Sequence, residues 1–317
     1  MIVVSATASI FLWGLPYLES LNNEQTVRNV EFQFNSIIDN IRDLVGGKTD
    51  GKNNFPVSAN DGEIRITGSE FDRTIVCYSY TDTDFTISGL DEYESSEFDS
   101  EFGININVPS LVASAKFFDD PKDPGNYTWE DLSVSGSTPT YTASATAPRV
   151  FSGRVCIFLN SSATVNFGKI WLFDSNPIKF ALNSNQGLYE LILEKGGIIY
   201  SENGDLEVKR PFSIFYDNDY FRINVLQMLA LTNFSAGANG FSTTISVASN
   251  GTWVQEQDRI VYHLRLQLYG DNAQTWLDYI YNKYQNEFTQ SGDTLHLDAS
   301  ADGVYFSFLN SIIKLDI

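Results

Sequence analysis

The residues that could perform chemistry are few and scattered along the chain. The two histidines, His263 and His296, lie in the alternating stretches "VYHLRLQL" and "TLHLDA", which predict strands. A serine-based triad needs such a histidine beside a nucleophile, and no G-x-S-x-G motif is present. A pair of glycosidase carboxylates is an open alternative among the 40 Asp and Glu residues, but no pair has distinctive flanks. The sequence therefore favours a protein that is not an enzyme.

Metal and cofactor sites also have little support. There is no C-x-x-C motif and no histidine cluster, which excludes the usual zinc and iron sites. The segment "FDDPKDPGN" gathers oxygen ligands suited to calcium, but it lacks the EF-hand spacing, so a turn rich in Pro and Asp is preferred. The glycines of "ELILEKGGIIYS" predict a hairpin turn and not a phosphate-binding loop. We expect no metal and no cofactor.

Two cysteines and four glycosylation sequons are the remaining sites of covalent chemistry. Cys77 and Cys156 are either two buried apolar residues or one disulfide between two strands, and the sequence leaves both open. The number of N-x-S/T sequons is what chance alone gives in a chain so rich in Asn, Ser and Thr. They are Asn126, Asn160, Asn233 and Asn250. If the protein is exported, Asn126 and Asn250 are the best candidates, because both are expected in loops.

The charge balance limits the partners. The chain has 20 Lys and Arg against 40 Asp and Glu, a net charge of −20. Nucleic acids and anionic lipid headgroups both require positive potential, so neither is an expected partner. The charge suits a soluble, solvent-facing surface.

The N-terminal stretch "MIVVSATASIFLWGLPYLES" has no charge before Glu19. A secretory signal peptide needs a basic start, and the first basic residue is Arg28. A complete membrane helix needs about 20 apolar residues, and this stretch is shorter and diluted by polar residues. A core helix of a soluble domain is a third alternative. The preferred interpretation is the lower part of a longer assembly helix, whose small residues permit close helix packing. Its filament-core residues would be Ile2, Val3, Val4, Ala6, Ala8, Ile10, Phe11, Leu12, Trp13, Leu15 and Leu18.

An amphipathic helix follows directly. Apolar residues spaced by three and four positions predict a stripe that docks on the rest of the protein. The stripe consists of Val27, Val30, Phe34, Ile37, Ile41 and Leu44, and Gly46-Gly47 predicts the end of the helix. Residues 1–47 are therefore expected to form one helix, kinked at Pro16 and on the order of 65 Å long.

From about residue 60 the pattern changes to the period of two that is typical of strands. We expect a mainly β protein with a long N-terminal helix, an antiparallel β-sandwich head of two lobes at 50–182 and 183–317, and one later helix at 271–288. The acidic segment "DEYESSEFDSE" (residues 91–101) is predicted to be a solvated loop.

The layout of "IVVSATASIFLWGLPYLESLNNEQTVRNVEFQFNSIIDNIRDLV" resembles archaeal type IV pilin-like proteins, in which a class III signal peptide is cleaved ahead of a hydrophobic helix. The segments "GGIIYSENGDLEVKRPFSIFYDNDYFRINVLQML" and "GDNAQTWLDYIYNKY" are similar to members with large heads. The cleavage region is not in this sequence and the stem is short for a pilin helix, so two alternatives are open: residues precede Met1 in the precursor, or an unusually short stem holds the filament.

The resemblance implies a structural subunit of an extracellular pilus-like filament on the cell surface. Its partners would be other copies of this chain, with contact to a membrane only before assembly. The β head would be exposed for adhesion to an unidentified surface or cell. The alternative is a membrane-anchored surface module that binds carbohydrate or cell wall.

Overall fold

The computed structural model describes residues 2–47, 51–67, 72–81, 86–95, 98–107, 114–118, 127–131, 140–142, 152–159, 166–237, 240–285, 287–298 and 302–316. Only the backbone is described in the first helix before Gly14 and in the strands between residues 86 and 159. The fold is mainly β, with a long N-terminal helix and several antiparallel sheets. The predicted mainly β class is therefore confirmed.

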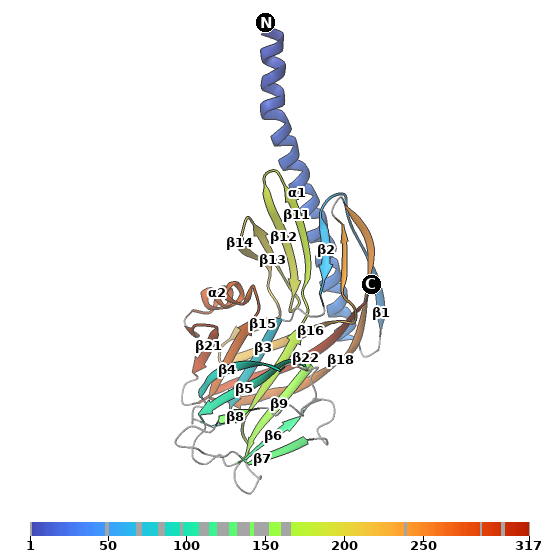
Figure 1. Cartoon of the computed structure of the whole chain (residues 1–317). Helices are drawn as coiled ribbons and strands as arrows, with labels where there is room; N and C mark the ends of the chain where they lie inside the picture. Colours follow the sequence, from blue (N-terminus) through green and yellow to red (C-terminus); the bar gives the residue numbers. More distant parts are fainter. Residues whose placement is uncertain are drawn as a thin grey trace.

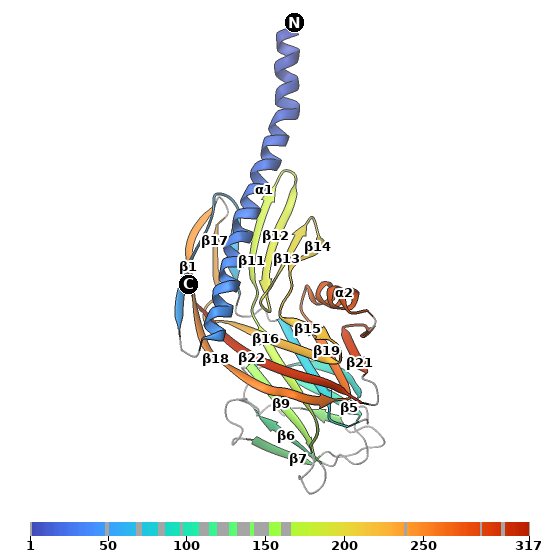
Figure 2. The same cartoon turned by 180° about the vertical axis from the view of Figure 1, so that it is seen from behind.

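Helix α1 (Ile2–Gly46) contains Pro16 and ends where the Gly46-Gly47 pair predicts. Its upper part extends away from the sheets, and its lower part lies among them (Figures 1 and 2). The second helix, α2 (Ala273–Lys283), is shorter than the predicted 271–288 and buries Trp276, Leu277 and Ile280.

Three larger sheets and one small one make up the remainder. The five-stranded sheet has the order β1 (Lys52–Ala59), β18 (Phe241–Val261), β22 (Val304–Asp316), β16 (Tyr220–Ala230), β15 (Ile214–Asp217). The six-stranded sheet has the order β14 (Asp205–Arg210), β13 (Gly197–Glu202), β12 (Gly187–Glu194), β11 (Ile178–Ser184), β2 (Glu63–Ile66), β17 (Phe234–Gly237). Within these two sheets β16 and β22 pair in parallel and the other pairs are antiparallel.

The eight-stranded sheet has the order β20 (Thr289–Ser291), β21 (Thr294–Asp298), β19 (His263–Tyr269), β3 (Asp72–Ser79), β10 (Asn166–Ser175), β9 (Ser152–Leu159), β6 (Ser114–Phe118), β7 (Tyr127–Asp131). The three-stranded sheet consists of β4 (Thr86–Ser95), β5 (Phe98–Asn107) and β8 (Thr140–Thr142). The acidic segment at 91–101 belongs to the β4–β5 hairpin, so its prediction as a loop was wrong.

Two hydrophobic cores hold these layers together. One surrounds the lower half of α1 and includes Phe34, Phe180 and Met228. The other lies between the eight-stranded and five-stranded sheets and is rich in aromatic side chains. The ring centroids of Trp171 and Phe308, from opposite sheets, lie 5.5 Å apart in an edge-to-face arrangement. Strands β16, β18 and β22 run through both cores, so the cores share one sheet.

The predicted lobes at 50–182 and 183–317 do not correspond to separate sheets. Strand β11 crosses that boundary, and each larger sheet combines strands from both sides of it, such as β3 beside β19. The strand pattern predicted the elements, but long-range pairing decides which of them lie together. The sheets therefore do not confirm the division of the chain into two sequential lobes.

Candidate functional site

The lower half of α1 is held by its apolar stripe. Five of the six stripe residues, Val27, Val30, Phe34, Ile37 and Ile41, are at most 6% exposed, and Leu44 is half-buried at the edge. Ile38 is also fully buried beside them. Their partners come from the five-stranded and six-stranded sheets, including Ile64, Leu191 and Ile245. The stripe therefore makes the helix part of a protein core.

Polar contacts fix the same helix along its sides. The Arg210 guanidinium donates hydrogen bonds to the carbonyl and side-chain oxygens of Asn35, at 3.2 and 3.0 Å, and to the Asp39 carboxylate. The hydrogen bond from Arg210 lowers the pKa of Asp39. Gln33 and Ser58 exchange two hydrogen bonds, at 3.0 and 2.8 Å, which tie the helix to β1.

The uppermost contacts of the sheets with α1 come from the turn between β11 and β12. Asn185 Nδ2 donates to Glu19 Oε1 at 3.1 Å, and Gln186 Nε2 donates to the backbone carbonyl of Pro16. The sheets therefore hold the helix from this proline downwards.

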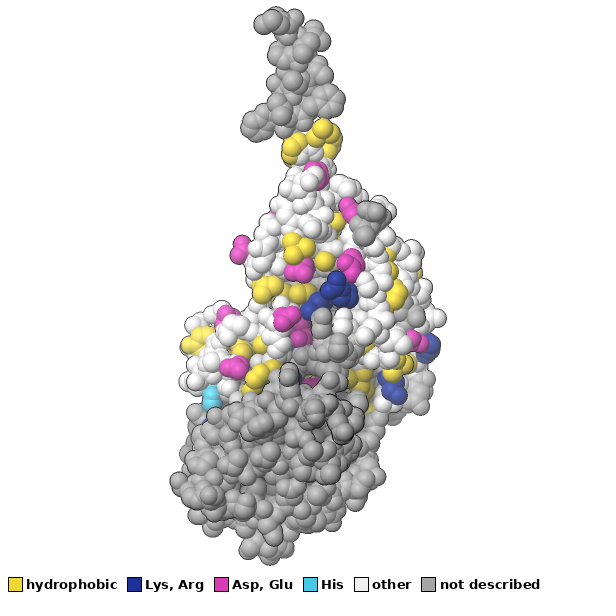
Figure 3. All heavy atoms as spheres, viewed as in Figure 1, with side chains coloured by type: hydrophobic (Ala, Val, Ile, Leu, Met, Phe, Trp, Pro, Cys, Tyr) yellow, Lys and Arg dark blue, Asp and Glu magenta, His cyan; other side chains and the backbone are white. Residues whose placement is uncertain are grey.

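Exposed apolar side chains surround the point where the helix leaves the sheets (Figure 3). Leu15, Tyr17 and Leu18 are 55%, 64% and 61% exposed, and Leu21 is 43% exposed. Leu15, Leu18 and Leu21 are spaced by three residues and so lie along one side of the helix. Of the predicted filament-core residues, Leu15 and Leu18 have described side chains. For the other nine, the structure describes only the backbone, which is part of α1. No helix in the searched part of the structure combines the length and the apolar character that crossing a membrane requires.

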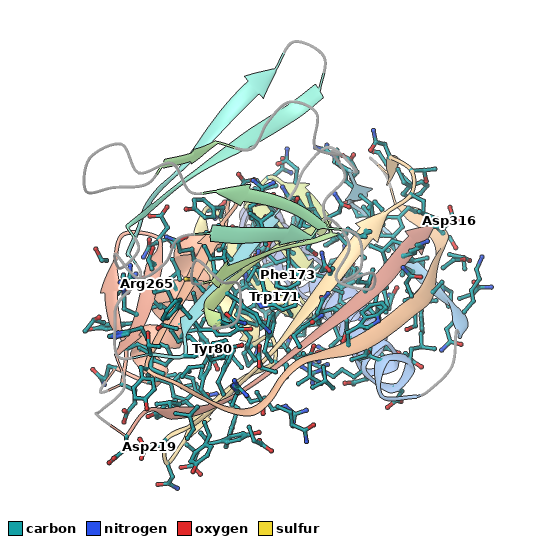
Figure 4. All side chains as sticks on the ribbon, turned by 90° about the horizontal axis from the view of Figure 1, so that it is seen from below. Tyr80, Trp171, Phe173, Asp219, Arg265 and Asp316 are labelled. Carbon is teal, nitrogen blue, oxygen red and sulfur yellow. The ribbon has the colours of Figure 1, made fainter. Side chains whose placement is uncertain are left out.

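A buried charged network lies between the eight-stranded and five-stranded sheets. Glu256 of β18 accepts hydrogen bonds from Tyr78, Tyr80 and Lys169, at 2.7, 2.5 and 2.6 Å. Trp171 Nε1 donates to the Tyr78 hydroxyl at 2.8 Å. Figure 4 shows Tyr80 and Trp171 within the packed side chains of this layer. Sequence reasoning missed Glu256, because only the irregular register of β18 places it opposite β3 and β10.

The same network perturbs its tyrosines. Burial, followed by the neighbouring charges and hydrogen bonds, raises the pKa of both Tyr78 and Tyr80. Both hydroxyls therefore stay protonated at neutral pH and act as donors to Glu256. The arrangement is a satisfied structural network, because every oxygen and nitrogen named here has a partner.

A second group, Asp72, Glu194 and Lys195, lies where the eight-stranded and six-stranded sheets meet. The side chains of Asp72 and Glu194 are only 7% and 1% exposed. A glycosidase needs its two carboxylates on either side of a bound sugar, and a pair this deeply buried leaves no room for one. This pair therefore gives no support to the glycosidase alternative.

The remaining predicted site residues are dispersed. His263 and His296 lie on adjacent strands, with His263 opposite Asp298 and His296 opposite Arg265. The described residues contain no group of three His, Cys, Asp or Glu side chains that could hold a metal ion. The calcium alternative, at residues 119–126, lies outside the described residues.

The strand register decides between the two interpretations of the cysteines. Cys77 in β3 and Cys156 in β9 are both opposite Ile170 of β10, on its two sides. Two strand spacings separate their Cα atoms by about 9–10 Å, which is beyond the reach of about 7 Å that a disulfide allows. A bond between these two cysteines therefore does not fit the register, and burial of Cys77 agrees with the apolar interpretation.

Two sequons can be placed in the structure. Asn233 is exposed just before β17, whereas Asn250 lies half-buried in β18 beside an irregularity in its register and not in a loop. Asn126 and Asn160 lie outside the described residues. Asn233 is therefore a better-placed glycosylation candidate than Asn250.

No family model, curated protein or solved structure matches the chain. The helix, the sheets and their contacts are therefore the basis for inferring its function.

Proposed function

We propose that this protein is a structural subunit of an extracellular pilus-like filament. The upper segment of α1 joins neighbouring copies of the chain, and the sheets face outward for adhesion or surface display. One observation supports this most strongly: α1 continues past the contact between Gln186 and the Pro16 carbonyl, with large apolar side chains exposed around that point.

Physical reasoning connects that observation to assembly. The segment from Ile2 to Leu18 carries no charge and is rich in apolar residues, and such a helix does not stay alone in water. Packing against the same segment of other copies would bury it. A head-to-tail interface that does not close on itself produces an open filament, and the net charge of −20 keeps the outward-facing surface soluble.

One deletion and one matched substitution test the proposal. The intact chain should form fibres visible by negative-stain electron microscopy, and a variant lacking residues 2–15 should remain a folded monomer by light scattering and circular dichroism. Phe32→Ser is the matched control, because Phe32 is 76% exposed on the same helix but below Pro16, and this variant should still form fibres. The proposal is contradicted if the intact chain stays monomeric both as purified protein in solution and when it is produced together with its export machinery.

A cavity favours a second function, the binding of a ligand by the head. It has a volume of about 240 Å³ and lies where the lower end of α1 meets β16, β18 and β22. Arg42 and Arg222 line it, and burial together with the charge of Arg210 lowers the pKa of Arg42. Crowded positive charge in an acidic protein suits an anionic group, such as the carboxylate of an acidic sugar.

Calorimetric titration with glucuronate tests this second function. Binding that Arg222→Gln abolishes, while Arg65→Gln on β2 leaves it unchanged, supports a ligand site in the cavity. Arg65 is a suitable control because it is exposed and, among the described residues, forms its ion pair with Glu63 at 3.3 Å. Heat changes that are identical in all three proteins contradict it.

A further inference from the structure

The buried group Asp72, Glu194 and Lys195 has an arrangement that ordinary ion pairs lack. Lys195 Nζ lies 3.6 Å from Asp72 Oδ2 and 3.8 Å from Glu194 Oε1. All three side chains are buried: the Lys195 side chain is 4% exposed, that of Asp72 is 7% exposed and that of Glu194 is 1% exposed. Lys195 sits in the turn between β12 and β13, and Asp72 begins β3 in a different sheet.

Neither of the facing atoms is satisfied. Lys195 Nζ and Asp72 Oδ2 are buried and have no hydrogen-bond partner among the described residues. A buried ammonium group without hydrogen bonds is costly, so such a group requires an explanation. Glu194, in contrast, accepts hydrogen bonds from Trp276 Nε1 and, at 3.1 Å, from Asn272 Nδ2.

The other buried lysine–carboxylate pair shows what a normal ion pair looks like in this protein. Lys169 Nζ lies 2.6 Å from Glu256 Oε1, and two tyrosine hydroxyls complete the shell of that carboxylate. A second carboxylate beside the lysine is what distinguishes the Lys195 group.

The protonation states suit a reaction between the lysine and the aspartate. Burial raises the pKa of Asp72 to about 8, with the Lys195 charge opposing and Glu194 adding to the increase. Burial also disfavours the ionised form of Glu194, but the Lys195 charge and the hydrogen bonds from Asp72, Trp276 and Asn272 outweigh it and lower its pKa. At neutral pH the group therefore contains a protonated, electrophilic Asp72 carboxyl and an ionised Glu194.

We propose that Lys195 Nζ and Asp72 Cγ become joined by an intramolecular amide bond, with Glu194 as the proton acceptor. The ammonium first gives one proton to Glu194, and the free amine adds to Cγ of the protonated carboxyl. A second proton passes from the nitrogen to one carboxyl oxygen through Glu194, and that oxygen leaves as water. The products are a neutral amide, one water molecule and a protonated Glu194. The charges balance, and no oxidant or other reagent is required.

The bond would remove both unsatisfied groups and would join the eight-stranded sheet to the hairpin that packs against α1. Its formation depends only on the folded chain. It is therefore independent of filament assembly, and each proposal can fail without the other.

Mass spectrometry of the purified, folded chain tests the bond directly. We expect the intact wild-type mass to be lower than the sequence mass by one water molecule. Tandem spectra should show a branched peptide that links the β3 segment to the β12–β13 segment at Asp72 and Lys195. A folded wild-type chain that keeps its full sequence mass after prolonged incubation refutes the proposal, and this measurement needs no variant.

Variants distinguish the amide bond between Lys195 and Asp72 from other reactions that also release water. Lys195→Arg keeps the positive charge and should restore the full mass, whereas Lys169→Arg is the matched control and should still lose one water. A loss of water that persists in Lys195→Arg indicates cyclisation of an aspartate on its own and overturns the assignment. Complete cross-linking in Glu194→Gln overturns the role given to Glu194.

Discussion

Replacing Phe34 by alanine tests whether the lower half of α1 belongs to the core or only lies on it. Phe34 is fully buried, and its neighbours come from two sheets, including Phe180, Leu191 and Met228. Truncation of a buried phenylalanine removes its transfer free energy and leaves a cavity, which together cost about 3–5 kcal/mol. We expect a loss of that size in the free energy of unfolding.

Urea denaturation followed by circular dichroism measures this loss, provided that the slope of the transition is unchanged. Phe32→Ala provides the matched control, because Phe32 is 76% exposed and only two residues away. A change within about 0.5 kcal/mol is expected there. If Phe34→Ala costs less than about 1 kcal/mol, or no more than Phe32→Ala, the helix is not integral to this core and the reasoning fails.

Three further predictions concern the sheets. The pKa of Tyr78 is raised above its ordinary value of about 10. The stability that the Tyr78 hydroxyl contributes is therefore complete below pH 10 and is lost as the pH rises above 10. Urea midpoints measured from pH 9 to 11 should fall less in Tyr78→Phe than in the wild type. Glu256→Ala should cost about 3–5 kcal/mol by urea denaturation, because it leaves Lys169 buried without its partner, and a loss below 1 kcal/mol would contradict this view of the network. Gly197→Ala places a Cβ 2.5 Å from the Trp276 ring and should cost about 1–3 kcal/mol; an unchanged melting temperature would show that the hairpin and α2 can move apart freely.

The N-terminal helix could be read from the sequence because its signals are local. The spacing of Val27, Val30 and Phe34 reports one face of a helix directly, and Gly46-Gly47 marks its end. The same spacing also predicted which side is buried. Neither inference needs information from elsewhere in the chain.

The arrangement of the strands could not be read in the same way. A period of two predicts a strand and its two faces, but it does not specify the neighbour, and β16 pairs in parallel with β22 across a long stretch of sequence. This is why the sheets do not confirm the predicted lobes at 50–182 and 183–317, although a mainly β protein was expected.

The buried charged groups were missed for a related reason. Glu194 and Lys195 looked like ordinary turn residues of a hairpin, although an acid at the end of the apolar run "LIL" was a usable signal. The glycines predicted the turn itself, and the residues that adopt positive φ in it are Lys195 and Gly196, with φ of 52° and 79°. Asp72 joins them only through the packing of two sheets.

The position of β22 has a consequence for the order in which this protein can fold during synthesis. Strand β22 lies between β18 and β16, and its side chains enter both cores, Phe306 and Phe308 in one and Ile313 and Leu315 in the other. Both cores therefore stay incomplete until residues 304–316 have left the ribosome. A chain whose two cores close this late completes its folding only when synthesis of β22 has finished.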